Sequence, residues 1–327
     1  MFRIASKPLG PSFRAFASAT SATISPSAVG PFQVFDRSTK RLQKDRAARR
    51  DGGSRSRMVD YVRDEVAERM AERFLDVKRK FSHVLDLGAG AGHFTKMLET
   101  DQTPKVTMLD ISRNMLDRDD DSDFDVSVER TQVDEEKLLE AIPRNSQEAI
   151  VSCLSLHWVN DLPGVLVQIR EALQPDGVFI GALFGGETLF ELRTALQLAE
   201  VEREGGISPH VSPMADPRDM SNLMSRAGFT LLTVDVDEVK VGYPSMWELM
   251  DDLRDMGESN AIIGRRHLIH RDTLVAASAI YKELHGEDDG SIPATFQVIY
   301  MIGWKPAPSQ PKPLERGSGQ TKLQDVI

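Results

Sequence analysis

The feature that most constrains the fold is a glycine run directly after a short apolar segment. Val84-Leu85-Asp86-Leu87 leads without a gap into Gly88-Ala89-Gly90-Ala91-Gly92, and a helical pattern follows at 94–98. Glycines between a strand and a helix let a ligand approach the backbone, where amide groups and the helix N-terminus converge. The glycine pattern alone is equally compatible with a tight turn that binds nothing.

The rest of the body alternates strands and helices. Apolar runs predict five strands, at 84–87, 106–110, 126–133, 149–154 and 178–183. Such alternation indicates an α/β fold, a doubly wound parallel sheet with helices on both faces. Two further strands are predicted at 231–236 and 296–304, and helices at 189–202, 220–227, 246–256 and 273–284. We therefore expect helical lid insertions after strands 5 and 6, at 185–228 and 243–293.

Carboxylates beside the glycines indicate a cofactor. Asp86 lies two residues before Gly88, where it could accept a hydrogen bond from a ligand ammonium. Asp110 ends the second strand, where an acidic residue binds both ribose hydroxyls in dinucleotide folds. His93 stands where the nicotinamide fingerprint needs its third glycine, so S-adenosyl-L-methionine fits better than NAD. Asp134 either accepts from the adenine amine or caps a helix that begins at Glu135.

Composition excludes several classes of protein. The 327 residues include one cysteine, Cys153, which rules out an intrachain disulfide framework and any multi-cysteine metal site. The formal net charge of -10 argues against a nucleic-acid binder. No apolar run approaches the ~20 residues that a membrane-spanning helix needs.

The N-terminal region is basic, in contrast to the acidic body. Residues 1–30 carry Arg3, Lys7 and Arg14 without an acidic residue and are rich in Ser and Ala, which is typical of a mitochondrial transit peptide, although a disordered tail has similar composition. Residues 31–57 form a basic arm, which either folds back on the acidic body or contacts an anionic membrane surface. The main domain is expected at 58–305 and a flexible tail at 306–327.

The residues around the glycine run resemble a known fold family. Asp86–Gly92, then Asp110-Ile111-Ser112 with Met115-Leu116, are similar to class I S-adenosylmethionine-dependent methyltransferases, a resemblance that covers roughly 58–304. It implies a Rossmann-like sheet of seven strands with an antiparallel last strand. It also implies that Ile111 and Met115 contact the cofactor with Asp86, Gly88, Gly90, Gly92, Asp110 and Asp134.

A narrower resemblance is more specific. Seven segments of the chain resemble the mitochondrial complex I assembly factor 5 family, whose members are related to bacterial malonyl-carrier-protein O-methyltransferases. The segments are Phe35-Asp36-Arg37, Ser155–Pro163, Phe184–Leu189, Glu202–Gly206, Met256–Asn260, His270–Thr273 and Ile302–Lys305. The resemblance implies a matrix protein, peripheral on the inner membrane, that acts early in building NADH:ubiquinone oxidoreductase. It implies hydroxylation of an arginine of the PSST-type iron–sulfur subunit, with that subunit and other assembly factors as partners.

Candidate catalytic residues follow the fourth and fifth strands. His157 and Trp158 lie at the carboxyl end of the sheet, where open α/β folds bind ligands; alternatively, Trp158 packs under the lid and His157 is on the surface. Glu187, together with Glu191 and Asp161, could pair with an arginine guanidinium. His270-x-Asp272 has suggestive metal spacing, but Asp272 is expected to cap the following helix, and no metal is predicted.

Three functions remain open from the sequence. The first is an assembly factor that hydroxylates arginine. The second is an S-adenosylmethionine-dependent methyltransferase that acts on a carboxyl group or a protein. The third is a non-catalytic chaperone that binds the same cofactor.

Overall fold

A computed structural model describes residues 33–266 and 268–311, all within one compact unit. The predicted transit peptide at 1–30 and the tail from 312 onward lie outside the described residues. Among the helices within these ranges, none combines the length and apolarity of a membrane span.

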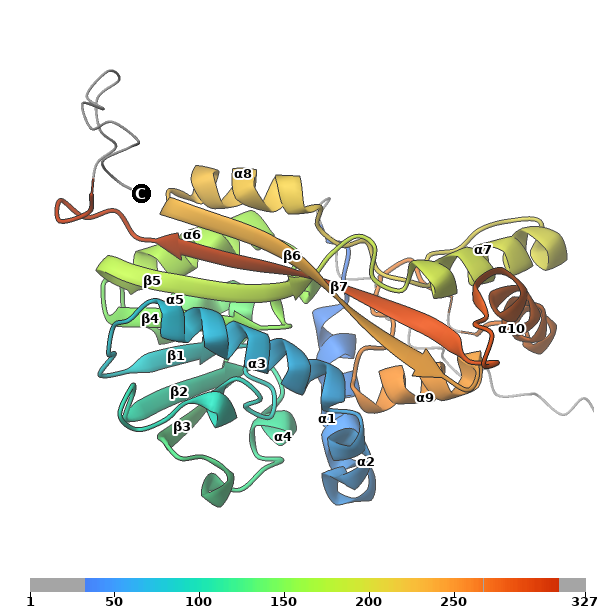
Figure 1. Cartoon of the computed structure of the whole chain (residues 1–327), viewed down its shortest axis with the longest axis horizontal. Coiled ribbons are helices and arrows are strands. Elements are labelled where there is room, and N and C mark those ends of the chain that lie inside the picture. Colours follow the sequence, from blue (N-terminus) through green and yellow to red (C-terminus); the bar gives the residue numbers. More distant parts are fainter. Residues whose placement is uncertain (1–32, 267, 312–327) are drawn as a thin grey trace, which may run out of the picture. The chain divides into compact units, whose positions relative to one another are not determined.

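A seven-stranded sheet organises the chain, in the order β3-β2-β1-β4-β5-β7-β6 (Figure 1). The strands β1 to β5 pair in parallel, and β7 runs antiparallel to both of its neighbours, which confirms the predicted fold. Strand order reverses between β1 and β4, so the crevice at their carboxyl ends is the place where such sheets bind ligands. The strands span Val84–Leu87 (β1), Lys105–Asp110 (β2), Ser127–Gln132 (β3), Gln147–Cys153 (β4), Leu173–Phe184 (β5), Thr230–Tyr243 (β6) and Ile292–Trp304 (β7).

Helices surround this sheet, and short 3-10 turns (η) join several of them. Up to β4 the helical elements are α1 (Arg37–Arg49), η1 (Arg50–Gly53), α2 (Ser54–Met58), α3 (Tyr61–Asp76), η2 (Thr95–Met97), α4 (Arg113–Leu116), η3 (Asp121–Asp123), η4 (Glu135–Lys137) and α5 (Leu138–Ala141). After β4 follow η5 (Leu156–Trp158), α6 (Leu162–Ala172), α7 (Phe190–Glu204), α8 (Pro217–Ala227), α9 (Met246–Asp255) and α10 (Arg271–His285).

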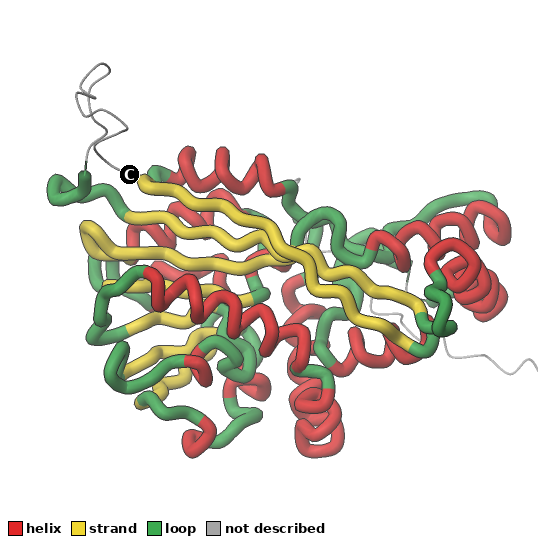
Figure 2. Tube along the Cα trace, in the orientation of Figure 1, coloured by secondary structure: helices red, strands yellow, loops and turns green. Residues whose placement is uncertain are grey.

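Separate apolar clusters cover the two faces of the sheet. Side chains alternate along a strand, so Val84 packs with α3 on one face, whereas Leu85 and Leu87 pack with α6 and α8 on the other. Figure 2 shows these layers of helix on either side of the strands. Because both faces are covered, every residue of β1 is buried, and all of them except Asp86 are apolar.

The lid regions differ from the prediction in two respects. Helix α8 packs against α6 and β6 and therefore covers the sheet instead of forming a lid. β6 and β7 are longer than predicted because their distal halves pair with each other, and α7, α9 and α10 gather around this extension (Figure 1).

The helix expected at 94–98, after the glycine loop, is only the single turn η2.

The basic arm folds back on the body as α1. Asp36 caps this helix by accepting from the backbone N–H of Thr39 at 3.0 Å. Lys40 and Lys44 are buried, whereas Arg41 and Arg46 are exposed. Helix α1 packs against α4 and α9, so it connects the carboxyl edge of the sheet with the second insertion.

Candidate cofactor and substrate sites

The glycine loop after β1 has a geometry that only glycine adopts easily. Gly88, Gly90 and Gly92 have φ values of 73°, 59° and 82°. A Cβ added to Gly88 would lie 2.2 Å from the Ser155 side chain, so this glycine lets the loops after β1 and β4 pass each other. A Cβ on Gly90 would meet nothing closer than Met115 Cγ at 3.8 Å, so space remains beside it.

Asp110 ends β2, as predicted, and is fully buried. Its Oδ2 accepts from the backbone N–H of Gly90 at 3.0 Å, and its Oδ1 accepts from that of Ser112 at 2.8 Å. Lys44 Nζ of α1 also donates to Oδ2, at 2.6 Å. The carboxylate is therefore oriented by backbone amides and neutralised by a distant segment of the chain. Ile111 is buried next to it.

Asp86 is the second buried carboxylate at this loop. Its Oδ2 accepts from Thr95 Oγ1 at 2.8 Å, whereas its Oδ1 has no hydrogen-bond partner among the described residues. Burial, together with the charge of nearby Asp110, raises the pKa of Asp86 to about 7, although the hydrogen bond from Thr95 acts in the opposite direction. A buried oxygen without a donor is uncommon in proteins, and it suits the ammonium of a ligand.

The hollow beside the glycine loop is small. Its volume is about 10 Å³, and it is lined by Lys44, Arg63, Gly88, Ala89, Gly90, Ala91, His93, Met115, Cys153 and Leu154. That volume corresponds to roughly one water molecule. The donors and acceptors fit a nucleoside amino acid such as S-adenosylmethionine: a carboxylate for its ammonium, a carboxylate for its ribose hydroxyls and a glycine loop. The hollow of about 10 Å³ is too small to hold that molecule.

Asp134 takes the capping role that the sequence left open. It precedes η4 and accepts from the backbone N–H of Glu136 at 3.1 Å. It also pairs with Arg37 Nη2 of α1 at 2.8 Å, and the neighbouring Glu135 pairs with the same guanidinium. Asp134 is not among the residues that line the hollow, and neither are Gly92, Ile111 or the fully buried Asp86 and Asp110.

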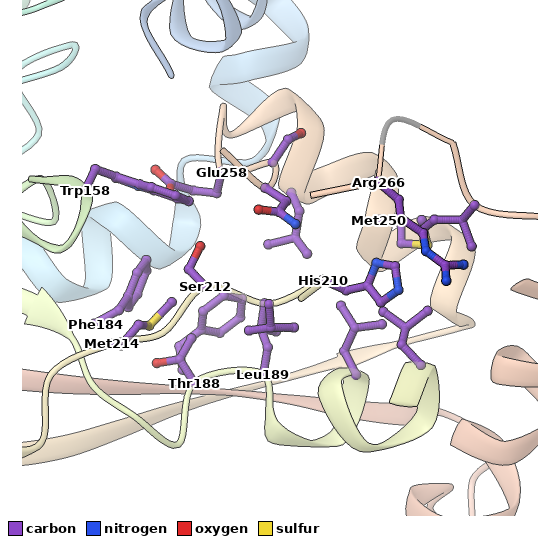
Figure 3. A pocket seen from close by; sticks show the side chains of 18 residues that line it. Trp158, Phe184, Thr188, Leu189, His210, Ser212, Met214, Met250, Glu258 and Arg266 are labelled. Atoms are coloured by element: carbon purple, nitrogen blue, oxygen red, sulfur yellow. The ribbon is translucent and has the colours of Figure 1, made fainter. Parts of the chain in front are cut away.

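A second, larger cavity lies beyond the carboxyl ends of β4 and β5 (Figure 3). Its volume is about 210 Å³, and most of its walls are apolar. The residues that line it are Trp158, Phe184, Thr188, Leu189, Leu192, Leu196, His210, Val211, Ser212, Met214, Met250, Leu253, Glu258, Ser259, Asn260, Arg266, Ile269 and Phe296. An apolar cavity with a few polar groups is the usual form of a substrate site.

Glu258 connects the cavity with the hollow. Trp158 Nε1 donates to its Oε2 at 2.6 Å, and Arg63 Nη2, from the wall of the hollow, donates to its Oε1 at 2.6 Å. Lys40 Nζ lies 3.2 Å from the centroid of the Trp158 ring. Burial disfavours the ionised form of Glu258. The charge of Lys40, a contact with His157 and the charge of Arg63 outweigh burial and hold the pKa of Glu258 well below the usual range. Glu258 is therefore an ionised carboxylate at the boundary of the two sites.

His157 is buried, so the alternative of a surface histidine is wrong. Its ring centroid lies 4.8 Å from that of Phe184 and 5.5 Å from that of Trp158, two residues that line the cavity. Nε2 is 3.6 Å from Glu258 Oε2, and both ring nitrogens are without a hydrogen-bond partner among the described residues. Burial lowers the pKa of His157, which favours the neutral ring.

The residues expected to bind a guanidinium do not meet at the cavity. Glu187 is exposed, and Asp161 caps α6 by accepting from the backbone N–H of Gly164 at 2.9 Å. Glu191 is buried and accepts a hydrogen bond from Thr295 Oγ1. The carboxylate that does line the cavity is Glu258, within the Met256–Asn260 motif, which the sequence analysis recognised without assigning it a site role.

The His270-x-Asp272 pair lies at the start of α10. Helix α10 begins at Arg271, so His270 occupies the capping position and Asp272 lies in the first turn. The expected cap by Asp272 is therefore wrong. Within 33–266 and 268–311, no group of three or more His, Cys, Asp or Glu side chains is placed to hold a metal ion.

The raised pKa of Asp86 predicts a pH-dependent stability effect. Between the ordinary value of 3.8 and about 7, the folded state keeps a proton that the unfolded chain has lost, so stability falls as the pH rises through this window. Asp86→Asn cannot ionise. The free energy of unfolding of the variant, measured relative to wild type by urea titration, should therefore increase by on the order of 1–3 kcal/mol between about pH 4 and about pH 8. Exposed Asp101→Asn is the control, and a gain independent of pH would contradict the assignment.

Comparisons with known proteins identify the family. A family model described as a methyltransferase domain matches residues 58–234. The mitochondrial arginine-hydroxylase NDUFAF5 of Danio rerio is 50% identical over 293 residues, which cover 90% of this chain and 89% of the relative. A malonyl-[acyl-carrier protein] O-methyltransferase of Halorhodospira halophila is 34% identical over 277 residues, covering 84% of this chain and 90% of the relative.

A solved structure supports the same fold. A candidate methyltransferase from Bacillus halodurans superposes with a TM-score of 0.50 at 14% sequence identity, covering 72% of this chain and 99% of that one. This likeness concerns the fold alone. Taken with the seven-stranded sheet and the identities above, it leads to one conclusion: the chain has the class I methyltransferase fold and belongs to the NDUFAF5 arginine-hydroxylase family.

Proposed function

We propose that this chain is a mitochondrial arginine hydroxylase that acts early in the assembly of complex I and modifies the PSST-type iron–sulfur subunit. The observation that carries the proposal is that motifs of the family resemblance meet around Trp158. Phe35 packs edge-to-face on the Trp158 ring at 5.3 Å, and Asn160 Oδ1 accepts from the backbone N–H of Phe35 at 2.7 Å. Glu258 accepts from the indole. Segments from three parts of the chain thus form one wall.

The larger cavity is the proposed arginine site. The methyltransferase model ends at residue 234, whereas Met250, Leu253 and Glu258 of the cavity wall come from the following insertion. The walls formed by Trp158 and Phe184 suit the aliphatic part of an arginine side chain. Among the described residues that line the cavity, Glu258 is the carboxylate available to orient a guanidinium.

The hollow is the proposed cofactor site. Asp86 Oδ1 would accept from the cofactor ammonium and Asp110 from its ribose hydroxyls, beside Gly88 and Gly90. When bound, S-adenosyl-L-methionine supplies an activated methyl group and a positive sulfonium charge. His157 and Trp158 are buried on the turn after β4, and Trp158 lines the larger cavity, where the two rings would exclude water from the reacting groups.

A methyltransferase is the second candidate function, because relatives at 34% identity carry that activity in their name. Mass spectrometry of the PSST-type subunit, purified from cells with and without this gene, separates the candidates. We expect one arginine to gain the mass of one oxygen atom only when the gene is present. A gain of one methylene group supports the methyltransferase, and an unchanged mass supports the non-catalytic chaperone; either result contradicts hydroxylation.

Matched variants make this measurement specific to the cavity. Trp158→Leu removes the ring that forms the wall, so the oxygenated fraction should fall about tenfold or more, because the substrate loses its alignment. Leu198→Ala, on the exposed face of α7, should leave it unchanged.

Cofactor binding is tested by calorimetry with S-adenosylhomocysteine. Asp110→Asn should weaken binding about tenfold or more, since a charged acceptor for the ribose hydroxyls is lost. Asp101→Asn is the matched surface control. If wild-type protein does not bind the nucleoside at all, the cofactor assignment fails.

We further propose that the protein is peripheral on the matrix face of the inner membrane. Arg41, Leu42 and Arg46 on α1 and Met58 on α2 are exposed, which gives a mixed basic and apolar surface. In flotation with anionic vesicles, Arg41→Gln combined with Arg46→Gln should weaken binding by about 1 kcal/mol per charge. Lys282→Gln on α10 is the control, and flotation that does not depend on anionic lipid would contradict the proposal.

A further inference from the structure

Lys44 places a buried ammonium on the carboxylate that we propose for the ribose. Its Nζ donates to Asp110 Oδ2 at 2.6 Å, and the two side chains are only 5% and 0% exposed. The same oxygen accepts from the backbone N–H of Gly90. A buried ion pair of this kind is difficult to separate, because the charge left behind would have no partner.

Lys44 also fills the space beside the glycine loop. It lines the hollow of about 10 Å³ opposite a loop where a Cβ on Gly90 would meet no atom closer than 3.8 Å. A volume of about one water molecule cannot hold a ribose. The ammonium and a pair of ribose hydroxyls therefore compete both for the oxygens of Asp110 and for the same space.

We propose that Lys44 is an internal occupant of the cofactor site, which neutralises Asp110 in the cofactor-free protein and leaves that carboxylate when a nucleoside binds. This inference rests on the proposed cofactor and adds to it a specific competitor within the chain. Binding then replaces one set of donors to Asp110 by another, so the buried carboxylate is never left without a partner.

The remaining contacts of α1 explain how Lys44 can leave. Arg37 pairs with Asp134 at the start of the helix, and Lys40 Nζ donates to the carbonyls of Gly257 and Ser259 at 3.0 and 3.1 Å. These anchors do not involve Asp110, so the four-methylene side chain of Lys44 can move while α1 remains docked. Because Lys40 lies one turn from Lys44 and binds on either side of Glu258, the arm also connects the cofactor site with the substrate cavity.

Calorimetry with S-adenosylhomocysteine tests the competition. Lys44→Met keeps an unbranched side chain that is one heavy atom shorter and has no charge, so we expect the nucleoside to bind about tenfold more tightly than to wild type. Arg41→Met, on the exposed surface of the same helix, should bind as wild type does. Equal or weaker binding to Lys44→Met, with wild type binding normally, overturns this inference alone. Absence of binding to both proteins overturns it together with the cofactor proposal.

A second measurement uses the wild-type chain and needs no variant to fold. Lysine acylation followed by mass spectrometry reports the accessibility of each amine. We expect labelling of Lys44 to rise severalfold when S-adenosylhomocysteine saturates the protein, while Lys40 stays protected as an internal reference. Protection of Lys44 that does not change with bound nucleoside overturns the inference. Neither measurement depends on hydroxylation, so the outcome is independent of the proposed reaction.

Discussion

Buried carboxylates at the carboxyl edge of the sheet depend on cations that distant segments supply. An ionised carboxylate without a partner is costly outside water, so Asp110 needs Lys44, Glu135 needs Arg37 and Glu258 needs Arg63. Two of these cations come from α1, which explains why the basic arm is docked as a helix on the acidic body. Where no cation arrives, as at Asp86, burial raises the pKa instead.

The two sites have different origins in the fold. The hollow belongs to the general methyltransferase core, since the glycine loop after β1, Met115 of α4 and Cys153 of β4 line it. The larger cavity is completed by α7 and α9 and by the loop that carries Glu258. The ion pair between Arg63 and Glu258 connects the hollow with the larger cavity, so a change in charge at one site alters the electrostatic potential at the other. A family that retains the core and alters the insertions can therefore change its larger cavity without changing its glycine loop.

Some elements were predictable because local pattern decides them, and others were not. The strand Val84–Leu87 and the lengths of α7 and α10 followed closely from apolar runs and helical spacing. β6 was predicted too short because its distal half alternates exposed and half-buried residues, and only its pairing with β7 makes it a strand. The Met256–Asn260 segment has no periodicity, so no local pattern places Glu258 in a site. Its burial and its contacts with Trp158 and Arg63 do. Glu187 had a plausible charge but points to solvent.

Local sequence specifies the glycine loop, the two aspartates beside it and the succession of the first five strands along the chain, because backbone conformation and strand ends depend on neighbouring residues. Tertiary structure alone decided what those aspartates contact. The partner of Asp110 lies 66 positions away in the chain, and the acceptor of the Trp158 indole lies 100 positions away. Such pairs form only when α1 and the second insertion dock on the sheet, since desolvation then requires every buried charge to find a partner.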